Sequence, residues 1–176
     1  MAEKMGLIMV YTGNGKGKTT AALGLLLRAS GHGAKVFMVQ FLKSDPSYGE
    51  IQAINKFLPT VTVLQSKRSR LTVADGFTEE DFIDAQEVFE KGKNALLSKS
   101  YDLVIFDELN FAVNCGLISL TDVLAMLAKK PAQVDVVLTG RNASEEIMKI
   151  ADLVSEVKEI KHHYQAGITA QKGVEY

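Results

Sequence analysis

The chain has 176 residues, of which 47% are hydrophobic and 23% are charged, as expected for one globular domain with a sizeable core. Its formal net charge of −1 gives no basis for general electrostatic binding to nucleic acid or to an anionic membrane. Cys115 is the only cysteine, which excludes an internal disulfide and favours a reducing, cytoplasmic location. No apolar run approaches the roughly 20 residues that span a bilayer. We therefore expect a single domain covering residues 1–176.

A strand at residues 7–11 and a helix from about Lys18 to Ser30 are the first predicted elements, and a glycine-rich loop joins them. Glycines let backbone N–H groups converge on an anion, and the helix N-terminus adds partial positive charge. Lys18 adds a full charge, and the Thr19 hydroxyl is placed to bind Mg²⁺. This layout is typical of a phosphate-binding loop (P-loop) and predicts a polyphosphate ligand, with ATP as first choice. The candidate nucleotide-binding residues here are Gly13, Asn14, Gly15, Lys16, Gly17, Lys18, Thr19 and Thr20.

The predicted loop is shorter and more basic than the common one. In the pattern of Gly, four residues and Gly-Lys-Ser/Thr, the first glycine would be residue 12, which is Thr12. Counting from Gly13 leaves three intervening residues, and Lys16 is a second lysine. We expect this loop to hold phosphates differently from the loops of kinases and GTPases. A glycine turn without a ligand is the alternative, and the flanking strand and helix argue against it.

A strand, a short helix and a short strand are predicted next, at residues 35–42, 49–57 and 61–64. The first of these strands is nearly continuous in apolar residues, as expected for a strand covered on both faces. A loop over residues 65–77 follows. It is either ordered or mobile without a ligand, and a mobile lid is one interpretation of it. Its basic residues are Lys67, Arg68 and Arg70.

A long helix is predicted to start at Thr78, where Asp81 completes a variant capping box. Its apolar residues recur at steps of three and four, so we expect one face to pack on the sheet. The residues of that face are Phe82, Ala85, Phe89, Gly92 and Leu96. Strands at 101–106, 134–138 and 153–160 alternate with helices that begin at Ser119 and Ser144.

Alternating strands and helices predict an α/β fold with a doubly wound, mostly parallel sheet. In such a sheet, ligands gather at the carboxyl ends of the strands. We therefore expect the loops after five of the strands to form one functional surface. These loops follow residues 11, 42, 64, 106 and 138.

Asp107 and Glu108 end the apolar strand that begins near residue 101. In P-loop proteins this is the place of the acid that holds Mg²⁺, so we predict a metal site made by Thr19, Asp107 and Glu108. Arg141 follows another strand end and is able to reach a terminal phosphate with two hydrogen bonds. An exposed loop arginine without a ligand is an equally good interpretation of Arg141.

His162 and His163 are adjacent, and adjacent side chains of an extended chain point to opposite sides. We therefore do not expect them to share a metal ion, and no cysteine pair is present to complete a zinc site.

The loop at residues 12–22 resembles the short, lysine-rich loop of the P-loop ATP:corrinoid adenosyltransferases, which act in vitamin B12 metabolism. The resemblance continues in the same order along nearly the whole chain. The matching segments are 28–33, 39–43, 49–50, 76–78, 107–109, 139–141, 151–156, 161–162, 166–167 and 170–176.

The resemblance implies a RecA-like three-layer fold and a specific reaction. In this family, the Co(I) of a reduced corrinoid attacks the 5′ carbon of ATP, forms a Co–C bond and releases tripolyphosphate. Family members bind ATP in the reverse of the usual direction, which agrees with the unusual loop. Lys16, Lys18, Mg²⁺ and Arg141 would neutralise the leaving group. We take Lys18, Lys16 and Glu108 as the candidate catalytic residues.

The family also implies partners and two departures from its pattern. A homodimer is expected, as is an electron donor such as reduced flavin or flavodoxin. Only six residues precede the first predicted strand, so we expect a short N-terminal cover over the site. Some relatives carry an aromatic pair against the corrin, of which Phe77 is kept while Glu79 replaces the second member. Phe77 is therefore a candidate corrin contact, or alternatively a hydrophobic staple for the helix after it.

Two other functions compete with the adenosyltransferase. A conventional P-loop phosphotransferase would yield ADP and needs a general base, for which Asp107 or Glu108 is available. The spacing of the loop argues against it. A nucleotide-binding module or regulatory ATPase would leave ATP intact or release inorganic phosphate.

Overall fold

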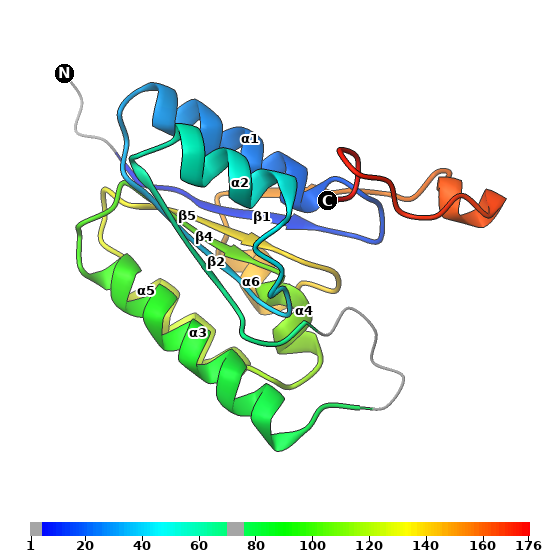
Figure 1. Ribbon diagram of the computed structural model, residues 1–176. Coiled ribbons are helices and arrows are strands. Elements are labelled where there is room, and N and C mark those ends of the chain that lie inside the picture. The colour runs from blue at the N-terminus through cyan, green and yellow to red at the C-terminus, as the bar shows by residue number, and fades with distance from the viewer. Residues whose placement is uncertain (1–4, 70–75) are drawn as a thin grey trace.

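A computed structural model describes residues 5–69 and 76–176, and its centre is one six-stranded sheet in which every pair of neighbours is parallel (Figure 1). The spatial order of the strands is β3-β2-β4-β5-β1-β6. The strands are β1 (Ile8–Thr12), β2 (Val36–Gln40), β3 (Val61–Gln65), β4 (Leu103–Asp107), β5 (Asp135–Thr139) and β6 (Leu153–Glu156). The prediction of a doubly wound α/β fold is confirmed, and the sheet is fully parallel.

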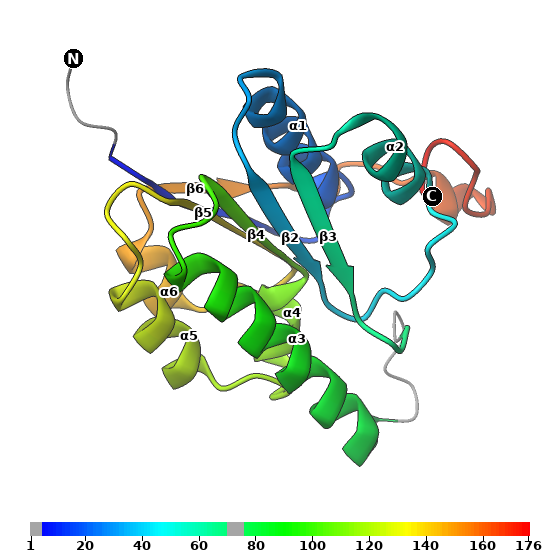
Figure 2. The same cartoon turned by 60° about the vertical axis from the view of Figure 1, so that its left-hand side comes forward.

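Helices cover both faces of the sheet, so the fold has three layers (Figures 1 and 2). Helices α1 and α2 pack on one face, and the other four α-helices pack on the opposite face. The helices are α1 (Lys18–Gly31), α2 (Gly49–Phe57), α3 (Glu79–Leu97), α4 (Leu109–Asn114), α5 (Leu120–Ala128) and α6 (Glu145–Ile150), and η1 (His163–Ala166) is a 3₁₀ helix. None of the helices in the described ranges is long and apolar enough to cross a bilayer.

Strand β4 shows why this sheet needs two helical layers. All five of its residues are buried, because successive side chains point to opposite faces and both faces are covered. Val104 and Phe106 join the core beneath α3, whereas Leu103 and Ile105 join the core beneath α1. A continuous apolar strand therefore belongs in the middle of the sheet.

Helix α3 starts as predicted, with a capping box in which the Thr78 N–H donates to Asp81 Oδ2 at 2.9 Å. One residue of its predicted buried face is wrong, because Phe82 is 41% exposed. Val88 is buried in the helix instead. The first turn of α3 extends beyond the sheet (Figure 2).

Other differences are local. Helix α4 and the 3₁₀ helix η1 were not predicted, and β6 ends at Glu156, four residues before the predicted strand end. The rings of His162 and His163 stack with centroids 4.5 Å apart, so the expectation that they point to opposite sides is wrong. A turn into η1 brings them together. No group of three or more His, Cys, Asp or Glu in the described ranges is arranged to hold a metal ion.

The predicted lid lies partly outside the described residues, because Arg70 falls in the range 70–75. Its first part is fixed to α3. The Lys67 N–H donates to both carboxylate oxygens of Asp84 at 3.1 Å, and Arg68 Nε donates to Asp81 Oδ1 at 2.9 Å.

Candidate active site

The P-loop fills residues 13–17, between the end of β1 and the start of α1. Gly17 is the N-cap of α1 with a φ of 120°, a conformation that favours glycine. Gly13 has a φ of 97°, and a Cβ there would lie 2.5 Å from the Val157 carbonyl oxygen. The Gly15 N–H donates to the same oxygen at 2.7 Å. The loop therefore needs its glycines because it packs closely against the chain that follows β6.

Lys18 is a buried cation at the start of α1. Its side chain folds back over the loop, and Nζ donates to the Gly15 carbonyl at 2.7 Å. Burial lowers the pKa of Lys18, although the negative charge of Glu108 opposes this shift. Lys18 therefore lies where the P-loop motif requires a lysine to meet phosphate oxygens.

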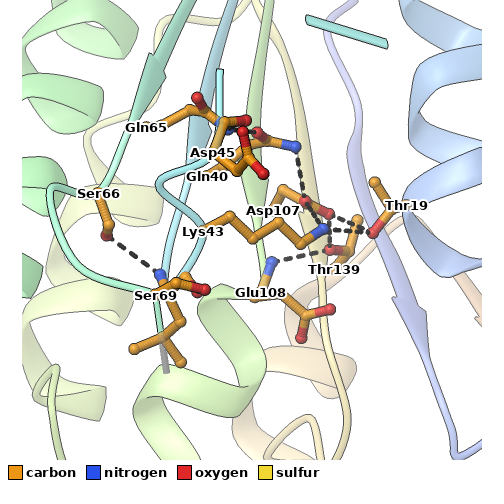
Figure 3. A network of polar contacts seen from close by, with 11 residues as sticks. Thr19, Gln40, Lys43, Asp45, Gln65, Ser66, Ser69, Asp107, Glu108 and Thr139 are labelled. Carbon is orange, nitrogen blue, oxygen red and sulfur yellow. Dashed lines mark hydrogen bonds and ion pairs between the residues drawn. The ribbon is translucent and has the colours of Figure 1, made fainter. Parts of the chain in front are cut away.

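Asp107 is the centre of the polar network at the end of β4 (Figure 3). Its side chain is fully buried, yet its oxygens accept hydrogen bonds from four side chains. The donors and distances are Thr139 Oγ1 at 2.7 Å, Lys43 Nζ at 2.7 Å, Thr19 Oγ1 at 2.9 Å and Gln40 Nε2 at 3.3 Å. This satisfies the rule that a buried charge needs paired and hydrogen-bonded partners.

Glu108 follows directly and has a left-handed backbone, with φ 65° and ψ 16°. Such a conformation in a non-glycine residue is strained and is often found at functional sites. The Glu108 N–H donates to Thr139 Oγ1 at 2.9 Å. Burial and the neighbouring Asp107 raise the pKa of the Glu108 carboxyl, against the pull of the Lys43, Lys18 and Arg141 charges.

Lys43 also belongs to this site, although it is not among the site residues predicted from the sequence. Its Nζ lies 2.7 Å from Asp107 Oδ2 and 3.2 Å from Thr19 Oγ1. Burial alone would lower the pKa of Lys43, but the Asp107 carboxylate outweighs it and raises the pKa. A signal was available, since Lys43 directly follows the strand predicted at residues 35–42, at the edge where the ligands of parallel sheets gather.

The network extends from Asp107 to the loops after β2 and β3 (Figure 3). Gln40 Oε1 accepts a hydrogen bond from Gln65 Nε2 at 2.9 Å, and Gln65 Nε2 also lies 3.3 Å from the Asp45 carbonyl. Ser66 Oγ accepts from the Leu42 N–H at 3.1 Å. These bonds hold the loops of three neighbouring strands together, as the topology predicts.

A cavity of about 570 Å³ opens beside this network, a volume within the range of ligand sites. Three lysines border it, and so does Glu108. The chain segments that line it are residues 16–20 and 23 of the loop and α1, Lys43, residues 48–50 and 53 around α2, Glu108, and residues 173–176.

The remaining predicted residues are more peripheral. Asn14 is exposed and, like Gly13 and Gly15, is not among the residues that line the cavity. Arg141 is exposed after β5, but its charge contributes to lowering the pKa of Lys18. Phe77 is partly buried against the core beneath α3, which suits its interpretation as packing ahead of the helix.

The chemistry of the donors fits a magnesium ion. Thr19, Asp107 and Glu108 offer a hydroxyl and carboxylates, the oxygen ligands that Mg²⁺ takes in phosphate sites. Two of these residues already meet, since Thr19 Oγ1 donates to Asp107 at 2.9 Å. The ammonium of Lys43 occupies the other oxygen of Asp107, so direct coordination by that oxygen requires Lys43 to move.

The parallel sheet, the Gly-Lys-Thr loop at the start of α1 and the buried acid at a neighbouring strand end define a P-loop nucleotide-binding protein. Comparison with known proteins narrows this class. The family described as ATP:corrinoid adenosyltransferase BtuR/CobO/CobP matches residues 4–176, and the chain belongs to this family. The resemblance found in the sequence is thereby confirmed.

Several relatives carry the name corrinoid adenosyltransferase. The one from Escherichia coli strain K12 is 38% identical over 174 residues, which cover 99% of this chain and 87% of the relative. The one from Pseudomonas aeruginosa is 38% identical over 180 residues, with 99% and 85% covered. Corrinoid adenosyltransferase CobA from Salmonella typhimurium is 37% identical over 174 residues, with 99% and 87% covered.

Proposed function

We propose that this chain transfers the 5′-adenosyl group of ATP to the Co(I) of a reduced corrinoid. The Co–C bond forms as the C5′–O bond breaks, and tripolyphosphate leaves with the bonding electron pair. The observation that carries the proposal is the cavity bordered by Lys16, Lys18 and Lys43, in a chain of this family. Three cations around one space suit a leaving group that bears charge on every phosphate.

The residues have separate roles in this proposal. Lys18 and Lys16 stabilise the negative charge that develops on the leaving tripolyphosphate, and Arg141 adds charge from the rim. Thr19, Asp107 and Glu108 would hold Mg²⁺, which when bound would neutralise phosphate charge. The corrinoid brings the nucleophile, so no covalent nucleophile or general base is required of the chain.

The finer expectations about partners belong to the same proposal. We expect the chain to work in the cytoplasm as a homodimer, with reduced flavin or a flavodoxin-type protein supplying the electron that makes Co(I). Phe77 is the proposed contact with the corrin face, with a hydrophobic staple for α3 as the alternative that its packing against the core favours. The chain's family membership supports these expectations.

An anaerobic assay with ATP, Mg²⁺ and chemically reduced cob(I)alamin tests the proposal. We expect the corrinoid absorbance to change to that of a light-sensitive adenosylcorrinoid, with tripolyphosphate as the phosphate product. Accumulation of ADP or inorganic phosphate, without a corrinoid change, would favour a phosphotransferase or ATPase instead. If neither the corrinoid nor ATP changes, the assay is repeated with an incomplete corrinoid. No reaction with that substrate would overturn the proposal.

Lys18→Ala tests the role of the loop. Because the variant removes a preorganised cation beside the leaving group, we expect its turnover to fall by about 10²–10³-fold. Lys35→Ala is the matched control, since Lys35 is an exposed lysine outside the cavity. Full turnover by Lys18→Ala would show that the loop does not bind the leaving group as proposed.

A further inference from the structure

The segment of residues 171–176 packs on the P-loop and lies apart from both hydrophobic cores. Lys16 Nζ donates to the Val174 carbonyl at 2.7 Å and lies 3.7 Å from Glu175 Oε1. Both ribbon views place the end of the chain beside α2 and the start of α1 (Figures 1 and 2). The second lysine of the unusual loop is therefore the anchor of this segment.

Contacts within the segment and with η1 hold its shape. The other oxygen of the Glu175 carboxylate, Oε2, accepts from the Gln171 N–H at 2.7 Å, and Oε1 lies 3.2 Å from His163 Nε2. The hydrogen bond from the Gln171 N–H lowers the pKa of Glu175. The Gly173 N–H donates to the Tyr176 carbonyl oxygen at 2.7 Å. The segment thus has a defined fold even though nearly all of it is at the surface.

Residues 173–176 line one side of the cavity, and residues 48–50 and 53 around the start of α2 line it as well. The rings of Tyr48 and Tyr176 approach each other with centroids 6.3 Å apart and planes tilted by 38°. Tyr176 is 43% exposed and is one of the residues that line the cavity.

Charge is unevenly distributed within the cavity. Its cations, Lys16, Lys18 and Lys43, come from the P-loop and from the loop after β2. The two tyrosines are joined by the apolar residues Leu23, Ala53 and Val174 and by the carboxylates of Glu50 and Glu175. The phosphates of a bound nucleotide carry negative charge and would contact the three lysines. The tyrosines and the apolar residues offer aromatic and apolar surface, which suits a planar base and a sugar.

We propose that the 171–176 segment and Tyr48 form the nucleoside-binding wall of the site, with Tyr176 as the residue that contacts the adenosine half of ATP. The proposal rests on the proposed function, because it needs the triphosphate of ATP to lie against the P-loop lysines. Lys16 then has two tasks, since it binds phosphate and holds the wall beside it. This wall recognises a nucleoside triphosphate over inorganic polyphosphate.

Calorimetric titration with ATP and with inorganic tripolyphosphate separates the two halves of the cavity. Loss of one base–aromatic contact should weaken binding by about 5–140-fold. We therefore expect Tyr176→Ala to weaken ATP binding by that factor and to leave tripolyphosphate binding unchanged. Tyr176→Phe keeps the ring and should keep ATP affinity. The matched control is Tyr164→Ala, because Tyr164 is exposed and lies outside the cavity lining.

Three results would contradict the proposed nucleoside-binding wall. The first is that the wild-type protein binds ATP no more tightly than tripolyphosphate. The second is that Tyr176→Ala leaves the affinity for ATP unchanged. The third is that Tyr176→Ala weakens the binding of both ligands equally. If the wild-type chain binds neither ATP nor tripolyphosphate, the result would instead contradict the proposed function, on which the wall depends. The chain has no tryptophan, so Tyr176→Trp adds a single fluorescent reporter. Its emission should respond to ATP and not to tripolyphosphate.

Discussion

At the scale of single residues, the stability of this site depends on how its buried charges are paired. The Asp107 side chain is completely buried and that of Lys43 is only 11% exposed. Burying such a pair costs desolvation energy, and the cost is recovered only when every remaining lone pair is hydrogen bonded. Thr19, Thr139 and Gln40 supply those hydrogen bonds.

Lys43→Met should destabilise the protein, because it leaves the Asp107 carboxylate buried without its cation. Breaking a buried pair in this way costs about 3–5 kcal/mol, and we expect the lower end since three donors remain. Denaturant unfolding measures the change, with exposed Lys35→Met as the matched control. Combining Lys43→Met with Asp107→Asn should cost less than the sum of the single changes. Strict additivity would show that the pair is not coupled.

Glu108→Gln should make the ligand-free protein more stable at neutral pH. Because the pKa of Glu108 is raised in the folded state, the folded protein binds more protons than the unfolded one between the ordinary value of about 4.3 and the folded value. Stability therefore falls as pH rises through that window. Glutamine is uncharged at every pH, so the variant does not lose this stability as pH rises. The difference in stability between the variant and the wild type should therefore disappear on acidification.

Thermal unfolding of both proteins across pH measures this difference. Glu146→Gln, at an exposed position in α6, is the matched control and should show little dependence. A Glu108→Gln variant that is less stable than wild type at neutral pH would contradict the prediction. Activity should fall in the same variant, as is common where a functional site is strained.

Helices α1 and α3 each contain a glycine, and the space around each glycine shows how closely the helix packs at that point. A Cβ on Gly92 of α3 would lie 2.5 Å from Phe106 Cε1 and 3.1 Å from Val39 Cγ2. A Cβ on Gly24 of α1 would meet no atom within 4 Å. The first glycine permits close packing of helix on sheet, whereas the second only adds backbone freedom.

Gly92→Ala and Gly24→Ala form a matched pair with opposite expected signs. Gly92→Ala overpacks the core and should destabilise by about 1–3 kcal/mol. Gly24→Ala should stabilise by about 0.5–1 kcal/mol, because alanine is a better helix former. Denaturant midpoints measured in one buffer compare them. A stabilised Gly92→Ala protein would mean that Phe106 moves aside at little cost.

At the scale of the whole fold, the described residues form one sheet with a core on each face, and the central strands β4 and β5 contribute to both cores. Such an arrangement should unfold in one cooperative step, which would support the single domain predicted for residues 1–176. Far-ultraviolet circular dichroism and tyrosine fluorescence should give coincident denaturation curves. ATP at 100 times its dissociation constant should add about 2.7 kcal/mol of stability. Two separated transitions would argue for more than one folding unit.

At the same scale, the sequence alone determined the class of fold and the type of loop. Local signals were sufficient there, because apolar strands, capping residues such as Thr78 and Ser119, and the glycines before Lys18 act on near neighbours. Topology then brought Thr19 and Asp107 together, since parallel strands end at one edge. That pair is 88 residues apart in the chain and its atoms are 2.9 Å apart in space.

Only the tertiary structure decided which charges meet. Lys43 pairs with Asp107 because the loops after β2 and β4 adjoin, and nothing local to either residue indicates it. The same holds for Lys16 and Val174, which are 158 residues apart. Propensity and periodicity act over a few residues, whereas the pairing of a buried charge depends on which segments the sheet order places side by side. The sequence therefore indicated a phosphate site with Lys16 and Lys18, and the packing of distant segments added Lys43 and residues 173–176 to it.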